Sequence, residues 1–296
     1  MAPVVRELSG GRAIADCFNL FNDGNGAVER DIADKLVLDQ PIEQLDAIET
    51  INPWTARLFQ FNSKRRIKHD LVYVLGKGSK YNNLEIKISI TSMLKFCSHW
   101  IGEIYVVGEN PGIHNPMVKH IYAPDITKAN KDGNIIHKLL AAINGIPKLS
   151  ENFLFCSDDI IVTKKSDWDD FVPRVVFEYR QNDAARQLLY KESKNNAWDK
   201  LLLKTLDRFV GNREHIYFYE PHIFAPINKK LFKQMCKQID YTNNRNVIIM
   251  SLWFNWLNLE NPPRKFDHMS VFSSTIPNLN NVPRHLSFND KSFAVK

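Results

Sequence analysis

The feature that most constrains the fold is an alternation of short apolar strands with helical segments between residues 70 and 162. The strands are runs such as DLVYVLG and IGEIYVVGE, and the segments between them have the apolar spacing of helices. Strand, helix and strand in this order predict right-handed crossovers, and therefore an α/β fold with a mostly parallel central sheet flanked by helices. The expected elements are, in order, strand 70–76, helix 82–100, strand 101–109, strand 118–124, helix 134–146 and strand 152–162.

Two adjacent carboxylates, Asp158 and Asp159, interrupt the last of these runs (FLFCSDDIIV, residues 153–162). Open α/β sheets bind ligands near the carboxyl ends of their strands. Magnesium and manganese prefer oxygen ligands, often one or two carboxylates completed by water and phosphate. Successive residues of a regular strand point to opposite faces, so both carboxylates can reach one ion only if the chain bends there. A metal site and a turn with two solvated acids both fit this pattern.

The charge of the chain favours an anionic partner. The 296 residues carry a formal net charge of +6, with basic runs at 64–68 (KRRIK) and 229–237 (KKLFKQMCK). A nucleotide, a phosphorylated glycan or a nucleic acid would match this charge. A solvated surface is the alternative explanation for each run.

No apolar stretch reaches the roughly 20 residues needed to span a bilayer, and no secretory leader follows Met1, so a cytoplasmic location is expected. The four cysteines are far apart in the sequence and form no CxxC pair, which predicts reduced thiols in the core. Residues 1–66 are expected to form a helical N-terminal extension. Residues 67–165 and residues 166–296 would be two halves of the same compact domain. The oligomeric state stays open.

The order of four segments resembles the stealth family of sugar-phosphate transferases and, more broadly, nucleotide-sugar glycosyltransferases of the A-type fold. The resemblance covers about residues 70–260, and its most specific part is IPKLSENFLFCSDDIIV. It implies a nucleotide-diphosphate-sugar donor, such as a UDP-sugar, over the carboxyl ends of the first strands. Residues 67–165 would then be the nucleotide-sugar-binding half and residues 166–296 the acceptor-binding half. A divalent cation, Mn²⁺ or Mg²⁺, would bridge the diphosphate to Asp158 and Asp159. The four segments are DLVYVLGKGS, NNLEIKISITSMLKFCSHWIGEIYVVGENP, NIIHKLLAAINGIPKLSENFLFCSDDIIV and YEPHIFAPINKKLF.

The same resemblance suggests further site residues. His137 and Lys138 lie where the family brings polar residues to the donor, although a solvated first helical turn is an alternative. His285 lies where some A-type enzymes bring a C-terminal histidine back to the metal, and a surface tail is the alternative there. The residues expected to contact the donor are Tyr73, Leu75, Gly76, Lys77, His137, Lys138 and Asp158.

The chain departs from the family at the loop after the first strand. Lys77 stands where stealth proteins typically have an aspartate, and Lys80 where another acid is often found. This loop cannot supply the carboxylate of the family, so the change favours glycosyl transfer over phosphosugar transfer. A lysine there suits a phosphate group of the donor.

Glycosyl transfer needs a base near the acceptor hydroxyl. Asp159 and His222 are expected catalytic residues, and Asp183 and Glu220 are further candidates for the base. His222 corresponds to the family's later histidine, with a structural turn histidine as the alternative. Arg245 matches an arginine of the family's next block and is expected to assist catalysis.

The sequence therefore predicts a metal-dependent glycosyltransferase that moves a sugar from a nucleotide donor to a polymeric, anionic acceptor. Hydroxymethylated DNA bases, as in phage DNA modification, are one candidate acceptor. A stealth-type sugar-1-phosphate transferase of capsule or surface polysaccharide synthesis is the second hypothesis. A non-catalytic nucleic-acid-binding α/β module is the third.

Overall fold

A computed structural model describes most of the chain from residue 68 onward. The expected N-terminal extension lies outside the described residues, as do Lys80, Asp183, Glu220 and Arg245. The described residues are 68–77, 82–126, 131–171, 173–179, 197–211, 213, 215–219, 222–239, 241–242, 247–259, 268–271 and 284–288.

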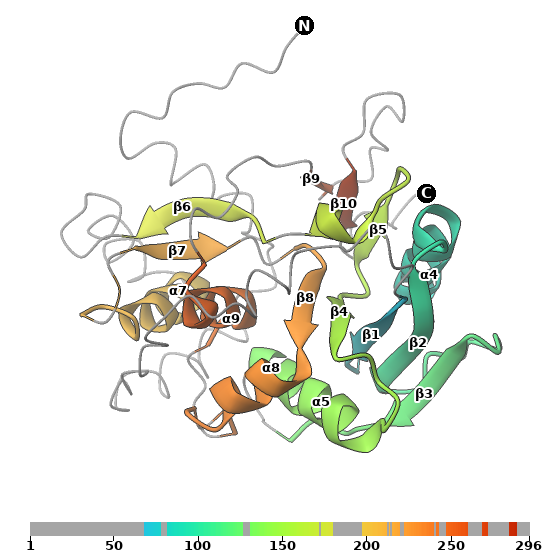
Figure 1. Ribbon diagram of the computed structural model, residues 1–296, viewed down its shortest axis with the longest axis horizontal. Coiled ribbons are helices and arrows are strands. Elements are labelled where there is room, and N and C mark those ends of the chain that lie inside the picture. Colours follow the sequence, from blue (N-terminus) through green and yellow to red (C-terminus); the bar gives the residue numbers. More distant parts are fainter. Residues whose placement is uncertain are drawn as a thin grey trace, which may run out of the picture.

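A five-stranded sheet with the strand order β3-β2-β1-β4-β8 is the centre of the fold (Figure 1). Strands β1 to β4 run parallel, and β8 adds an antiparallel edge beside β4. The predicted mostly parallel sheet is therefore confirmed. Its strands are β1 (His69–Leu75), β2 (Ile101–Gly108), β3 (Val118–Tyr122), β4 (Asn152–Cys156) and β8 (Ala225–Asn228).

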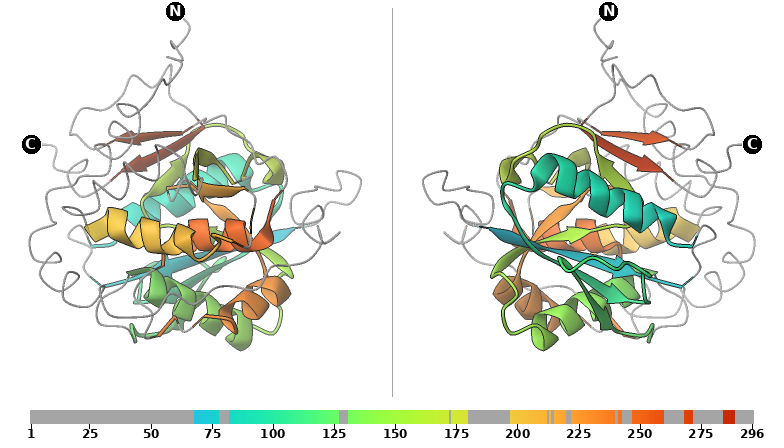
Figure 2. Two further views of the ribbon diagram at one scale, coloured as in Figure 1. Left: turned by 90° about the vertical axis from the view of Figure 1, so that its left-hand side faces the viewer. Right: turned by 90° about the vertical axis from the view of Figure 1, so that its right-hand side faces the viewer.

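Helices cover both faces of this sheet, so its central strands are apolar on both sides. Helix α4 (Leu84–Cys97) lies on one face and helix α5 (Lys131–Gly145) on the other (Figure 2). In β1, Leu71 and Tyr73 belong to the core on the α4 side, whereas Val72 belongs to the core on the α5 side. This arrangement is typical of parallel sheets, which rarely expose a face.

The second half of the chain extends the core on the α5 side. Strands β6 (Val175–Tyr179) and β7 (Ile216–Tyr219) form an antiparallel pair, and the apolar helix α9 (Ile249–Leu257) is buried along its whole length. Asn228 begins helix α8 by accepting a hydrogen bond from the Leu231 amide (3.0 Å). The remaining helices on this side are α7 (Ala197–Asp207) and α8 (Lys229–Cys236). The short helix η1 (Trp168–Phe171) instead packs into the core on the α4 side.

The predicted strand 152–162 is wrong as a single element, because the chain turns at Asp158 and Asp159. It continues as β5 (Ile160–Val162), which leaves the central sheet and joins a second one of order β5-β10-β9. The partners of β5 are β9 (His268–Val271) and β10 (His285–Phe288), both from the end of the chain. The boundary proposed at residue 165 stays a prediction, although β8 and β10 both pair with strands that precede it.

Three of the four cysteines, Cys97, Cys156 and Cys236, are buried free thiols, as expected, and Cys17 lies outside the described residues. None of the helices in the described part of the chain combines the length and the apolar character needed to cross a bilayer.

Candidate active site

Polar and charged residues gather at the carboxyl edge of the parallel strands. Lys77 follows β1, Glu109 follows β2, Asp125 lies beyond β3, and Asp158 with Asp159 follows β4. Parallel strands end at the same edge of a sheet, so the topology brings these segments together.

The acidic pair lies in a turn rather than in a strand. β4 ends at Cys156 and β5 begins at Ile160, so Asp158 and Asp159 occupy the bend between them, and both are half-buried. Because the chain bends here, the two side chains need not point to opposite faces as they would in a regular strand. Both carboxylates can therefore point toward one ion. Burial and the neighbouring charge of Asp159 raise the pKa of Asp158 to about 6.

Two charged residues that the sequence did not single out influence the acidic turn. Lys131, the first residue of α5, lowers the pKa of Asp158, whereas Glu85, buried in the first turn of α4, raises it. Each helix follows a strand of the parallel sheet, so its first turn begins at the same edge as the acids. This positional rule is the signal that could have identified both residues.

His222 lies at the same edge. It precedes β8, whose first residue, Ala225, pairs with Phe155 near the end of β4. Burial raises the pKa of Asp132 in α5, whereas the charges of Lys131 and His222 lower it. Asp132 also accepts a hydrogen bond from the Ile249 amide at the start of α9 (2.9 Å). Lys131 thus acts on both Asp158 and Asp132, and His222 on Asp132.

The two predicted donor-binding lysines have different surroundings. The Lys77 side chain is 72% exposed and its ammonium lies 3.8 Å from a Glu109 oxygen. The Lys138 side chain is only 2% exposed, and its Nζ donates hydrogen bonds to the Leu75 carbonyl (3.0 Å) and to Asp125 Oδ1 (2.5 Å). Lys77 can therefore move to meet a ligand, whereas Lys138 is held between β1 and the segment after β3.

His137, beside Lys138, is half-buried. Burial and the Lys138 charge lower its pKa, whereas Asp125 acts in the opposite direction. Gly76 is exposed at the end of β1, with open space around the position of a Cβ atom. An added Cβ atom at Gly76 would therefore meet no atom of the described residues within 4 Å.

Tyr73 and Leu75 belong to the core, so their side chains do not line the edge. The Tyr73 hydroxyl is hydrogen-bonded to Ser89 Oγ of α4 (3.1 Å). The Leu75 carbonyl accepts hydrogen bonds from Lys138 and from the Glu109 amide. The structure therefore does not favour the expected contacts between the donor and the side chains of Tyr73 and Leu75.

His285 is not brought to the acidic turn by the described strand pairing. It is buried in β10 opposite Val162, three residues beyond Asp159, and its ring centroid lies 5.2 Å from that of Phe171. Within the part of the chain that the structure describes, no three His, Cys, Asp or Glu side chains are grouped as metal ligands. Among the described residues, the two carboxylates of the acidic turn are therefore the groups that a cation could use there.

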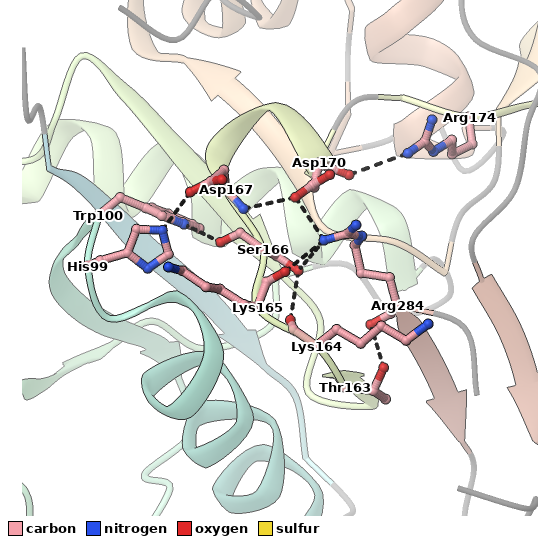
Figure 3. Close-up of polar contacts among 10 residues, drawn as sticks. All are labelled: His99, Trp100, Thr163, Lys164, Lys165, Ser166, Asp167, Asp170, Arg174 and Arg284. Atoms are coloured by element: carbon pink, nitrogen blue, oxygen red, sulfur yellow. Dashed lines mark hydrogen bonds and ion pairs between the residues drawn. The ribbon is translucent and has the colours of Figure 1, made fainter. Parts of the chain in front are cut away.

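A hydrogen-bond network fixes the chain that leaves the acidic turn (Figure 3). Arg284 Nη1 donates to the Lys165 carbonyl (2.8 Å), to Ser166 Oγ (3.2 Å) and to Asp170 Oδ2 (2.9 Å). The Arg284 carbonyl accepts a hydrogen bond from the Thr163 amide (3.0 Å). The end of β5 and the start of η1 are thereby tied to β10.

Two carboxylates with this environment fit a divalent cation. Two acids side by side in a half-buried turn repel each other, and a cation with oxygen ligands would remove that repulsion. Magnesium is commonly held by one or two carboxylates, with water and substrate phosphates filling the other positions. The absence of a third protein ligand among the described residues is compatible with such a site.

No protein-family model matches the sequence, and no curated protein matches it. Among solved structures, the galactosyltransferase LgtC in complex with donor and acceptor sugar analogues has a TM-score of 0.42 and 11% identity, over 74% of this chain and 86% of that chain. An active-site mutant of LgtC has the same values. Mouse xyloside xylosyltransferase 1 has a TM-score of 0.40 and 10% identity, over 77% of this chain and 99% of that chain.

Proposed function

We propose that this chain is a metal-dependent glycosyltransferase of the A-type fold, with a nucleotide-diphosphate sugar as donor. The observation that carries the proposal is the half-buried turn of Asp158 and Asp159 at the carboxyl edge of a parallel sheet, with Lys131 close enough to lower the pKa of Asp158. Negative and positive groups at one edge match a cation and a diphosphate respectively.

Asp158 and Asp159 would hold Mn²⁺ or Mg²⁺, which when bound stabilises negative charge on the departing nucleoside diphosphate. Lys77 and Lys131 would add positive charge for the diphosphate oxygens. Gly76 leaves room for the donor over the end of β1. UDP-sugars are the donor class that we expect.

In the transfer step, the bond between the anomeric carbon and the diphosphate oxygen breaks, and a bond from that carbon to the acceptor oxygen forms. The acceptor hydroxyl loses its proton to a base on the protein. His222 and Asp159 are the described candidates for this base, and Arg245 is expected to assist from outside the described residues. The nucleoside diphosphate leaves with the electron pair of the broken bond.

The acceptor that we propose is polymeric and anionic, in keeping with the net charge of +6. DNA with hydroxymethylated bases and an acidic glycan both fit. The basic run at 229–237 is unsuited to bind the part of the acceptor that reacts. It begins α8 at the amino edge of β4, where the Lys229 amide donates to the Glu151 carbonyl (3.0 Å). Lys77 and Lys131, which are exposed at the carboxyl edge, are closer to the acidic turn.

The test is a thermal-shift titration with UDP and UDP-sugars, with and without Mn²⁺. A ligand that binds only the native state raises the melting temperature by mass action. We expect a shift for wild type that needs both Mn²⁺ and nucleotide, and none for Asp159→Asn. No shift for wild type would contradict the proposal and favour a binding module.

The nucleotide that is released then identifies the reaction, because glycosyl transfer releases UDP, whereas sugar-1-phosphate transfer releases UMP. Chromatography of the products, with hydroxymethylated DNA or an acidic glycan as acceptor, measures which one forms. UMP would overturn glycosyl transfer and support the stealth-type reaction.

A further inference from the structure

We infer that Ser89 is a positioning residue that fixes the acidic turn for cation binding, and that Tyr73 acts through it. The inference rests on the proposed metal site at Asp158 and Asp159. Ser89 lies in α4 and is fully buried. Its hydroxyl donates a hydrogen bond to the Ile160 carbonyl at 2.5 Å, and Ile160 directly follows Asp159.

The orientation of β5 explains why a helix side chain is needed here. The Thr163 amide donates to the Arg284 carbonyl, so these two residues form a hydrogen-bonded pair beside the β5–β10 ladder. Hydrogen-bonded pairs alternate along an antiparallel ladder. Ile161 therefore exchanges hydrogen bonds with β10, whereas the main-chain groups of Ile160 and Val162 point away from it.

Two serines of α4 meet these outward-pointing groups. Ser89 donates to the Ile160 carbonyl, and Ser92 Oγ accepts from the Val162 amide at 3.0 Å. Ser92 Oγ also donates to the Ser89 carbonyl at 2.7 Å, which is compatible because a hydroxyl has one donor and two acceptor sites. The spacing of three residues places both serines on one face of α4. Side chains of the helix thus replace a neighbouring strand along this edge of β5.

A further hydrogen bond extends this contact to the central sheet. The Tyr73 hydroxyl lies 3.1 Å from Ser89 Oγ. Since Ser89 gives its single proton to the Ile160 carbonyl, Tyr73 donates to Ser89. Tyr73, Ser89 and Ile160 are all fully buried, where hydrogen bonds are strong and unmet polar groups are costly. β1 is thereby linked through α4 to the residue beside Asp159.

The consequence for function is control of carboxylate geometry. Removing a group that orients a metal ligand without touching the metal typically changes metal affinity by about 10- to 100-fold. Ser89 does not contact the expected cation, and acts by holding the main chain at Ile160. Tyr73 therefore serves the site from the core rather than by touching the donor.

The experiment compares Ser89→Ala with a matched buried serine. Ser251 is also fully buried, and its hydroxyl accepts a hydrogen bond from the Tyr219 amide (3.1 Å) in the core on the α5 side. Both alanine variants remove one buried hydroxyl, so both should lower the melting temperature. Tyr73→Phe is the milder second variant. Mn²⁺ affinity is measured by electron paramagnetic resonance of the free ion, and hydrogen exchange is measured at residues 158–162 of the metal-free protein.

We expect Ser89→Ala to weaken Mn²⁺ binding by about tenfold and to accelerate exchange in the turn, with Tyr73→Phe acting in the same direction. Ser251→Ala should change neither measurement. An unchanged Mn²⁺ affinity and unchanged exchange in Ser89→Ala would overturn the inference. If wild type binds no Mn²⁺, the proposed function fails, and the exchange measurement alone decides whether Ser89 fixes the turn.

Discussion

At the scale of single residues, the acidic turn contains a repulsion that a cation would relieve. Burial raises the pKa of Asp158, the charges of Asp159 and Glu85 raise it further, and Lys131 supplies the positive charge that lowers it. Groups with strongly perturbed pKa values are found preferentially at functional sites. The metal-free protein should therefore show this repulsion in its stability.

The first prediction is a pH-dependent stabilisation by Asp158→Asn. The pKa of Asp158 rises from 3.8 to about 6 on folding. Between about pH 4 and pH 6 the folded protein retains a proton that the unfolded chain has lost, so stability falls as the pH rises through this window. The shift corresponds to at most about 3 kcal/mol. In EDTA, Asp158→Asn should melt above wild type at pH 7 and alongside it at pH 4, measured by calorimetry.

Glu151→Gln is the control for this prediction, because it removes an exposed carboxyl at the opposite edge of the sheet. It should follow wild type across the whole range. Equal melting temperatures of Asp158→Asn and wild type at pH 7 would show that burial and the charge of Asp159 do not disfavour the ionised Asp158 as described.

A second prediction distinguishes the roles of Lys77 and Lys138 at the carboxyl edge of the sheet. The exposed Lys77–Glu109 pair contributes at most about 1 kcal/mol, so Lys77→Met should leave stability unchanged and weaken UDP binding in the presence of Mn²⁺. Lys138→Met leaves the Leu75 carbonyl and Asp125 without their buried partner and should lower the free energy of unfolding by about 2 kcal/mol. Urea unfolding and calorimetric titration measure the two effects. Unchanged UDP affinity in Lys77→Met would exclude that residue from the site.

At the scale of elements, the ends of β1 and β2 meet so closely that one position requires glycine. Gly108 has a φ of +128°, and a Cβ atom there would lie 2.0 Å from the Leu75 carbonyl oxygen. Gly108→Ala should therefore cost more than about 2 kcal/mol of unfolding free energy. At Gly76 nothing lies within 4 Å of the Cβ position, so Gly76→Ala should be close to neutral. Urea denaturation compares the two variants. Equal free energies of unfolding would contradict the close approach of Gly108 to the Leu75 carbonyl.

The elements that were predicted correctly depend on local pattern. The helix expected at 82–100 is α4 (Leu84–Cys97) and the one expected at 134–146 is α5 (Lys131–Gly145), each within a few residues at its ends. Apolar spacing specifies these elements without reference to the rest of the chain. The break at Asp158 was missed because apolar residues continue on both sides of it, and β5 is recognisable only by its pairing with β10.

The candidate site shows the same division. The acidic pair was identified because its chemistry is visible in adjacent residues. Glu85 and Lys131 were missed because their influence on Asp158 depends on the order of strands in the sheet. Tyr73 was assigned to the donor from its position in β1, but the packing of α4 directs its hydroxyl to Ser89.

At the scale of the whole molecule, exposed lysines lie at both ends of the central sheet. Lys77 follows β1 and Lys131 begins α5, and both are exposed at the carboxyl edge. Lys233 and Lys237 are exposed on and just after α8, which begins at the amino edge. An anionic acceptor that reaches the acidic turn should meet the first pair and not the second.

The last prediction compares these two pairs by reversing their charge. In the absence of nucleotide, Lys77→Glu with Lys131→Glu should weaken binding of a duplex containing hydroxymethylcytosine, whereas Lys233→Glu with Lys237→Glu should not. Each lost phosphate contact lowers the slope of log affinity against log salt by about 0.9, so the first double variant should lose about two units of slope. Fluorescence anisotropy at several salt concentrations gives both values. Equal losses in the two variants would show that the acceptor does not approach the carboxyl edge. If wild type binds an acidic glycan but not this duplex, DNA is excluded as the acceptor, and the same pair of variants can then be compared with the glycan.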